Sequence, residues 1–197
     1  YIEILDEINE KEILQKLEIV GRVCYESEHA IINDSCYDFI EKIIKLGHLS
    51  ILEHVSISVR IICNRAISHQ LVRHRIASFC QSSQRFCNYS NNKFGNQLTF
   101  IEPDFELDEE DKDLLLRIES NYMRKLKNGV IPQQARYFLP NGLQTKLIAT
   151  MNLRQWRYVL ALRTSKKADT QMQQIMNMIL DKFIEAMPII FKDIRKE

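Results

Sequence analysis

The stretch RHRIASFCQSSQRF, residues 73–86, concentrates basic and hydroxyl side chains within a chain that is otherwise almost neutral. It places three arginines and a histidine around three serines, namely Arg73, His74, Arg75, Arg85, Ser78, Ser82 and Ser83. The guanidinium fork of arginine matches two phosphate oxygens, and a hydrogen bond to such a charged group contributes about 1.5–3 kcal/mol. Serine hydroxyls and the free amides of a turn add uncharged donors. The stretch therefore predicts the wall of an anion-binding pocket, formed where a helix leads into a serine-rich loop.

The spacing of the first two arginines adds a geometric hypothesis. Arg73 and Arg75 are two positions apart, so on a helix their side chains diverge by roughly 200°. On that premise they do not bind one phosphate together, and they serve either two ligands or one ligand reached from two subunits. The alternative is a solvated basic helix end, because cations favour the C-terminal end of a helix dipole. Ser83 and Arg85 downstream favour the pocket.

Composition limits the possible classes of protein. The chain has 197 residues, a formal net charge of +1 and 45% hydrophobic residues, which indicates a single globular domain spanning residues 1–197. No run of 18 apolar residues is present, so no membrane span is expected. Near-neutral charge argues against a nucleic-acid partner. The five cysteines are odd in number and form no C-x-x-C pair, which is typical of reduced thiols and predicts a cytoplasmic location.

Hydrophobic periodicity predicts an α+β fold with a mixed or antiparallel sheet flanked by helices. HVSISVRIIC, residues 54–63, alternates apolar and polar positions as a half-buried strand does, and residues 143–152 predict a second strand. A capping box formed by Ser35 and Asp38 predicts a helix that ends at Gly47. Further helices are expected at 10–24, 64–74, 108–127, 153–164 and 168–186, with a short helix at Pro132 and a loop at 88–97.

The basic stretch also resembles a known family. Arg73-His74-Arg75, followed after seven residues by Ser83, is similar to the signature of the flavin-dependent thymidylate synthases. Other segments resemble that family in the same order, namely GRVCYES (21–27), GHLSILEH (47–54), Gln70, QARYFLP (134–140), MNLRQW (151–156) and LALRT (160–164). The resemblance covers most of residues 21–174.

The resemblance implies a reductive methylation of dUMP to dTMP. The carbon would come from methylenetetrahydrofolate, and the hydride from FAD reduced by NADPH. It also implies a homotetramer in which several chains contribute to each active site. A pocket of that kind would let neighbouring arginines face different ligands.

By position, the resemblance assigns residues to the two main ligands. The residues implied for FAD are His48, Ser50, Arg73, His74, Arg75, Gln81, Asn152, Leu153 and Arg154. Those implied for dUMP are Gln70, Leu71, Val72, Arg73, Gln81, Ser82, Ser83, Gln84, Arg85, Arg136 and Arg163. The catalytic role falls to Arg163, which would stabilise negative charge on the uracil ring. Arginine is too weak an acid to protonate that ring, but its fixed charge lowers the cost of the ionised form.

Three positions depart from the family pattern. Gln81 stands where many members have Glu, Tyr158 where Asn or His is common at the flavin, and Lys167 where His or Arg is common. Ser83 could also be interpreted as a nucleophile, but no His–acid pair accompanies it in the local sequence, so we interpret it as a phosphate donor.

Alternative interpretations remain for several residues. His69 and His74 are five positions apart and show no zinc spacing, so no metal site is expected. Glu53 either anchors the following strand or supports the site, and Trp156 is expected in the core. A nucleotide-phosphate sensor without flavin, or an RNA-binding module with stacking aromatics, remains open as a different class. A yellow purified protein would favour the enzyme over both.

Overall fold

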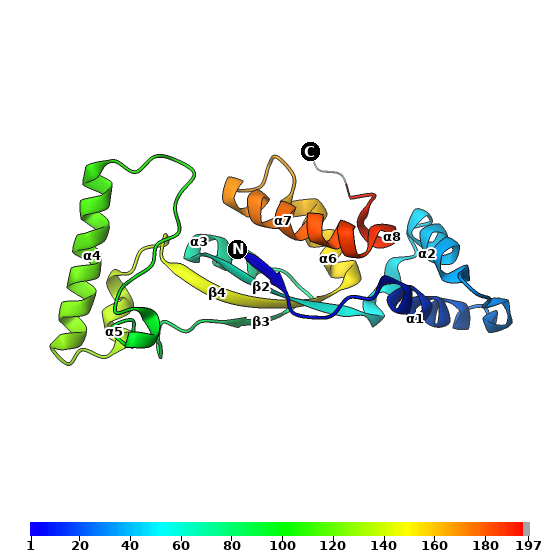
Figure 1. Ribbon diagram of the computed structural model, residues 1–197, viewed down its shortest axis with the longest axis horizontal. Coiled ribbons are helices and arrows are strands. Elements are labelled where there is room, and N and C mark those ends of the chain that lie inside the picture. The colour runs from blue at the N-terminus through cyan, green and yellow to red at the C-terminus, as the bar shows by residue number, and fades with distance from the viewer. Residues whose placement is uncertain (195–197) are drawn as a thin grey trace. The chain divides into compact units, whose positions relative to one another are not determined.

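The structure, a computed structural model, describes residues 1–194, which form two compact units. The first unit contains Tyr1–Arg60, His74–Ser78 and the described chain from Ala149 onward, and the second contains Ile61–Arg73 and Phe79–Ile148. The sheet has four strands in the order β1-β2-β4-β3 (Figure 1). These are β1 (Ile2–Ile4), β2 (Ser56–Asn64), β3 (Ser78–Gln81) and β4 (Gln144–Asn152). The assignment of residues 1–197 to a single domain stays a prediction.

The two long strands confirm the expected alternation. The side chains of β2 alternate between buried and partly exposed positions, and those of β4 do the same. In the first unit, the hydroxyls of Ser58 and Thr150 lie 2.9 Å apart across the two strands. In the second unit, the backbone N–H of Arg65 donates to the carbonyl of Leu143. Higher residue numbers on one strand pair with lower numbers on the other, so the strands are antiparallel and the α+β prediction is confirmed.

Both long strands turn directly into helices at an asparagine. Asn64 ends β2 and caps α3 (Arg65–Leu71), because its side-chain oxygen accepts from the N–H of Ile67 at 2.9 Å. Asn152 ends β4 and caps α6 (Leu153–Arg163) in the same way, accepting from Gln155 at 2.8 Å. Asparagine is among the best residues at this position, since its side chain satisfies an N–H that the first helical turn leaves free.

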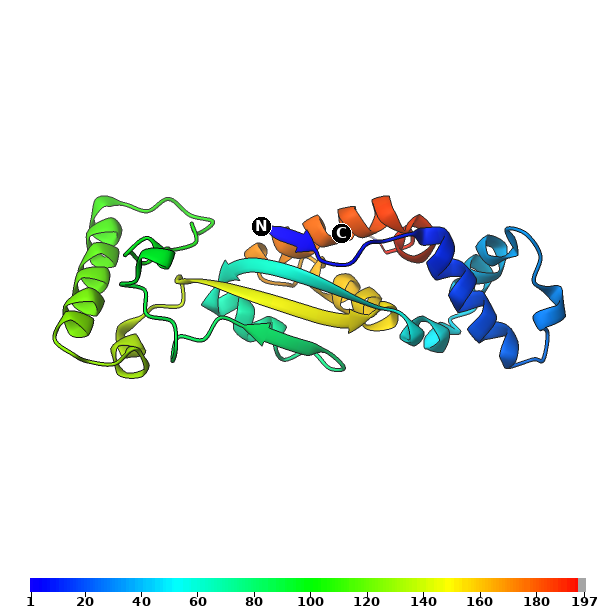
Figure 2. The same ribbon diagram turned by 60° about the horizontal axis from the view of Figure 1, so that its bottom comes forward.

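The first unit holds most of the helices. Besides α6 they are α1 (Glu10–Val23), α2 (Ser35–Lys45), α7 (Thr170–Ala186), α8 (Pro188–Phe191) and the short 3-10 helices η1 (Glu28–Ala30) and η2 (Leu49–His54). α1 packs against α2, and α6 runs beside α7 (Figures 1 and 2). Trp156 of α6 is fully buried, donates its indole N–H to the carbonyl of Ile57 at 2.9 Å and meets the ring of Phe183 edge-on. Its expected core position is confirmed.

The start of α2 differs from the capping box that the sequence predicts. Asp34 is the N-cap residue but makes no side-chain cap, and Ser35 is already the first residue of the helix. The hydroxyl of Ser35 donates instead to the carboxylate of Glu18 on α1, whose two oxygens lie 2.8 and 2.9 Å from it. The prediction was wrong because a buried carboxylate on a neighbouring helix competes for this hydroxyl. Gly47 does follow the helix, with the positive φ of +73° that favours glycine there.

The second unit packs a smaller core. It contains α3, α4 (Glu109–Lys127), α5 (Pro132–Ala135) and the 3-10 helices η3 (Asn92–Phe94) and η4 (Arg136–Phe138). Its buried cluster consists of Leu98, Tyr122, Ala135 and Leu143. The expected long helix is confirmed, and Asp108 caps it through a reciprocal box with Asp111.

Three local features differ from the sequence-based expectations. β1 was not predicted, since three residues are too short to show a period. Residues 78–81 form strand β3 within the segment expected to be a loop. α3 ends at Leu71, so Arg73 and Arg75 do not lie on a helix, and the premise of the 200° argument was wrong. Within residues 1–194, no helix combines the length and the apolar character needed to cross a bilayer.

Candidate active site

One end of α6 brings together part of the residue set implied for FAD. His48 precedes η2 and Ser50 lies within it, and η2 packs against α6 in the first unit. Arg154, in the first turn of α6, donates through Nη1 to Glu53 of η2 at 2.6 Å. Glu53 therefore orients an arginine of the candidate site, which supports the site-related interpretation of this carboxylate.

Asn152 and Leu153 have less freedom to meet a ligand than their positions suggest. The side-chain oxygen of Asn152 is used in capping α6, which leaves its amide N–H groups as donors. The side chain of Leu153 is fully buried, and its backbone N–H donates to the carbonyl of Val55. The structure thus places Leu153 in the core of the first unit rather than on a surface that its side chain could offer to a cofactor.

The other end of α6 joins two residues that the sequence separates widely. Arg163 is the last residue of α6, and its Nε donates to Nε2 of His74 at 3.0 Å. The His74 side chain is buried, and burial, followed by the positive charge of Arg163, lowers the pKa of its imidazole below the usual value. His74 is therefore neutral near pH 7. Arg75, the next residue, donates through Nη1 to the backbone carbonyl of His74.

The second unit holds the remaining residues implied for dUMP. Arg85 donates through Nε to the side-chain oxygen of Gln133 on α5 at 3.2 Å, and its guanidinium lies 5.0 Å from the ring centre of Phe86. Gln133 and Arg136 line one shallow cavity of about 510 Å³. Gln133 thus connects Arg85 to the segment that carries Arg136, a link that the sequence analysis missed because no local spacing marks it.

Ser83 and its neighbours lie beside Arg85, whose backbone N–H donates to the Ser83 hydroxyl at 3.3 Å. No histidine or carboxylate hydrogen-bonds this hydroxyl in the described part of the chain, so the nucleophile interpretation gains no support. Ser82 is held by its backbone N–H, which donates to the carbonyl of Lys146. Of the other implied residues, Leu71 is buried, whereas Gln70, Val72, Arg73 and Gln84 are partly or fully exposed.

Gln81 has a defined hydrogen-bond role in the second unit. Its Nε2 donates to the hydroxyl of Ser68 at 2.8 Å and to that of Thr145 at 3.2 Å. Ser68 is fully buried and already donates its own proton to the carbonyl of Arg65 at 3.0 Å. While Ser68 donates its proton to Arg65, its oxygen accepts from residue 81, which fits the amide of Gln, whereas a carboxylate there would compete for that one proton.

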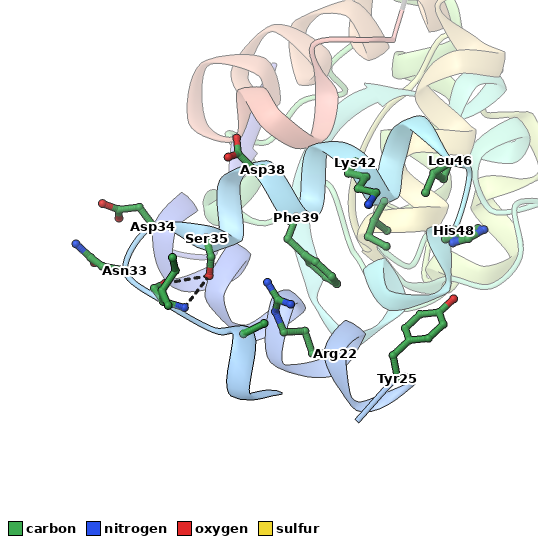
Figure 3. A pocket seen from close by; sticks show the side chains of 13 residues that line it. Arg22, Tyr25, Asn33, Asp34, Ser35, Asp38, Phe39, Lys42, Leu46 and His48 are labelled. Atoms are coloured by element: carbon green, nitrogen blue, oxygen red, sulfur yellow. Dashed lines mark hydrogen bonds between the residues drawn. The ribbon is translucent and has the colours of Figure 1, made fainter. Parts of the chain in front are cut away.

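A cavity of about 770 Å³ opens in the first unit between α1, α2 and the segment that joins them (Figure 3). His48 is the only residue implied for FAD among those that line it. Arg22 lies over the ring of Phe39 at 4.7 Å and is held by Glu18, a carboxylate that is almost completely buried. Gly21 allows this packing, because a Cβ there would lie 2.7 Å from the Phe39 ring. The i, i+4 spacing of Glu18 and Arg22 was the sequence signal that could have revealed the pair.

Metal-binding side chains do not gather in the described residues. Within residues 1–194, no three His, Cys, Asp or Glu side chains lie together as a metal site would need. His69 instead contacts Arg65 of the same helix, with 3.0 Å between Nη2 and Nε2. All five cysteines are free thiols.

Known proteins similar to this chain point to a family that fits these arginine-containing clusters. A family profile described as "Thymidylate synthase complementing protein" matches residues 4–189. The chain is 34% identical over 174 residues to a flavin-dependent thymidylate synthase of Pyrococcus abyssi, covering 84% of this chain and 70% of that protein. It is 35% identical to the Pyrococcus furiosus protein of the same name, covering 79% of this chain and 65% of that protein.

A third relative, from Mycobacterium sp. (strain JLS), has the same name and is 30% identical, covering 90% of this chain and 78% of that protein. The arginine clusters and these matches define an enzyme of nucleotide metabolism. The chain belongs to the flavin-dependent thymidylate synthase family. It spans between 65% and 78% of the length of the three relatives described.

The direction of hydrogen-bond donation around Gln81 predicts how a substitution at this position changes stability. Gln81→Glu places a carboxylate against the Ser68 oxygen, whose proton is already committed, and should lower the free energy of unfolding by about 1–3 kcal/mol at pH 7. Since the folded state disfavours the charged form, the introduced carboxyl has a raised pKa, and the deficit should shrink as the pH falls. Urea denaturation from pH 4.5 to pH 8 measures this (a range set by the ordinary pKa of Glu, about 4.3).

Gln84→Glu is the matched control, because within residues 1–194 the Gln84 side chain makes no hydrogen bond. It should change the free energy of unfolding by less than about 0.5 kcal/mol. If Gln81→Glu and the unmodified chain are equally stable at pH 8, the site accepts either a donor or an acceptor at residue 81, and the prediction is wrong.

Proposed function

We propose that this protein catalyses the reductive methylation of dUMP to dTMP. Methylenetetrahydrofolate supplies the carbon, and FAD, reduced by NADPH, supplies the hydride. The reaction fits a family whose members are named flavin-dependent thymidylate synthases. The proposal includes the homotetramer, with several chains completing each site, and a cytoplasmic location with no nucleic-acid partner.

The contact between His74 and Arg163 is the observation that carries the proposal. These residues are 89 positions apart, and both belong to segments that resemble the family's functional motifs. Their side chains nevertheless meet at 3.0 Å within one compact unit. A partly buried polar contact of this kind removes water from both groups, so its presence supports a shared role at a site rather than two unrelated surface positions.

The donor set around α6 fits the anionic and carbonyl groups of a flavin dinucleotide. Arg154 and the hydroxyl of Ser50, at one end of α6, offer donors for a diphosphate, whereas Arg75 and the neutral His74, at the other end, offer donors for ring acceptors. When bound, the flavin supplies the hydride. Glu53 keeps the Arg154 guanidinium oriented, and burial of His74 keeps that side chain uncharged in the absence of ligand.

The residues implied for dUMP would have two roles, phosphate binding in the second unit and charge stabilisation by Arg163 in the first. Ser83, Arg85 and Arg136 would bind its phosphate, with Gln133 holding Arg85 in place. The terminal nitrogens of Arg163 would stabilise negative charge on the uracil ring. In the described chain only Nε of Arg163 makes a hydrogen bond, which leaves the planar fork available to a ligand.

The flavin part of the proposal is tested by purification and an omission assay. The protein should purify yellow, and dTMP should form only when dUMP, methylenetetrahydrofolate, NADPH and FAD are all present. Arg75→Ala should lose flavin affinity by about ten- to a hundredfold, because a charged donor is removed. Arg117→Ala, on the exposed face of α4, is the control and should bind flavin normally. A colourless protein that forms no dTMP in the complete mixture contradicts the function.

The roles of Ser83 and Arg163 are separated by a second prediction. Ser83→Ala removes one hydrogen bond to a charged group, so the affinity for dUMP should fall by roughly ten- to a hundredfold while turnover persists at high dUMP. Arg163→Lys keeps a cation but loses the planar fork, so dTMP formation should fall further while NADPH still reduces the flavin. Flavin reduction and dTMP formation are measured separately in both variants. The assignment is reversed if only Ser83→Ala abolishes dTMP formation at saturating dUMP.

A further inference from the structure

The hydrogen bond between Arg163 and His74 fixes the protonation of the histidine ring. A guanidinium has only N–H donors, so Nε2 of His74 must accept the bond from Nε of Arg163 at 3.0 Å. A neutral imidazole carries one proton, which therefore resides on Nδ1. The described chain provides no hydrogen-bond partner for Nδ1, and this atom is not a buried unsatisfied group. The ring thus presents one oriented donor outward while its other nitrogen holds the arginine.

The same bond fixes the direction of the Arg163 guanidinium. Arg163 is the last residue of α6, and a free arginine side chain loses rotamer entropy when a ligand orders it. Anchoring Nε to a buried ring pays part of that cost before a ligand arrives and leaves both terminal nitrogens available. Positioning of this kind raises the rate of a reaction more than it raises the affinity for the substrate.

We propose that His74 is a positioning residue: its Nε2 holds Arg163 while its Nδ1–H is offered to the flavin, so that one ring joins the group that binds the cofactor to the group that binds the substrate. This inference rests on the proposed function for the identity of the two ligands. Its geometric part, the tautomer and the Arg163 contact, stands on the structure of the chain alone.

The charges around the ring predict how the contact responds to pH. Arg163 from α6 is the charged side chain that acts on the imidazole, and Arg75 donates through Nη1 to the backbone carbonyl of His74. Protonation of Nε2 removes the acceptor and places two cations side by side. Because the pKa of His74 is below its usual value, the contact should persist at neutral pH and be lost as the pH falls through that lowered pKa.

The first measurement needs neither flavin nor activity. Nitrogen-15 NMR of histidine-labelled protein, without cofactor, should show His74 with its proton on Nδ1 at pH 7.5, and His74→Phe assigns the signal. Arg163→Lys should move the ring toward a mixture of the two tautomers. A proton on Nε2 in the unmodified chain would overturn the inference, whatever the protein catalyses.

The second measurement compares two substitutions of the same residue. His74→Phe keeps a planar ring but has no acceptor, and kcat for dTMP formation should fall by about ten- to a hundredfold, more than KM for dUMP rises. His74→Gln places an amide oxygen close to the former Nε2, and should recover most of kcat. It should also lose the acid limb of the pH profile, because an amide does not titrate in this range. Thermal melting of both variants shows whether each one folds.

His69→Phe is the matched control. His69 also meets an arginine at 3.0 Å, but it is exposed on α3 and outside the candidate site. Its removal should leave kcat and the pH profile unchanged. If the unmodified protein forms dTMP and His74→Phe and His74→Gln are equally active, the positioning role is wrong. If the unmodified protein forms no dTMP, the proposed function fails, and NMR alone decides the contact.

Discussion

The direct passage from strand to helix at Asn64 and Asn152 is the constraint on which the candidate site depends. Neither junction has a connecting loop, because one side chain ends the strand and satisfies a free N–H of the first helical turn. The starting points of α3 and α6 are therefore set by the ends of β2 and β4. Every candidate residue that follows at a fixed distance along these helices inherits its position from the sheet.

α6 then acts as a spacer of defined length in the first unit. Its first turn carries Arg154, held by Glu53, and its last residue is Arg163, held by His74. At about 1.5 Å per residue, a helix of this size separates the two arginines by roughly 13 Å. Trp156, buried against Ile57 between them, prevents the helix from sliding. The two cations are thus spaced by a rigid element rather than by flexible side chains.

Helices and strands with a clear hydrophobic periodicity or a capping motif could be predicted from the sequence. Contacts between distant segments could not. The alternation in residues 54–63 predicts β2, and the acidic start of α4 predicts its cap. β3 was missed because its four residues lie among serines and arginines with no hydrophobic period. The Ser35 capping box was wrong because Glu18, on another helix, binds the hydroxyl. A local pattern does not record such a competitor.

The same limit applies to the chemistry of the site. The sequence identified His74 and Arg163 by resemblance, but it did not show that they touch or which nitrogen carries the proton. It identified Gln81 as a departure from Glu, but the reason lies in Ser68, whose proton is committed to a backbone carbonyl. In both cases the direction of donation in a partly buried hydrogen bond decides which side chain the position accepts. At a position that matches the family pattern, the residue type is therefore weaker evidence of its role than the donor and acceptor roles in the hydrogen bonds around it.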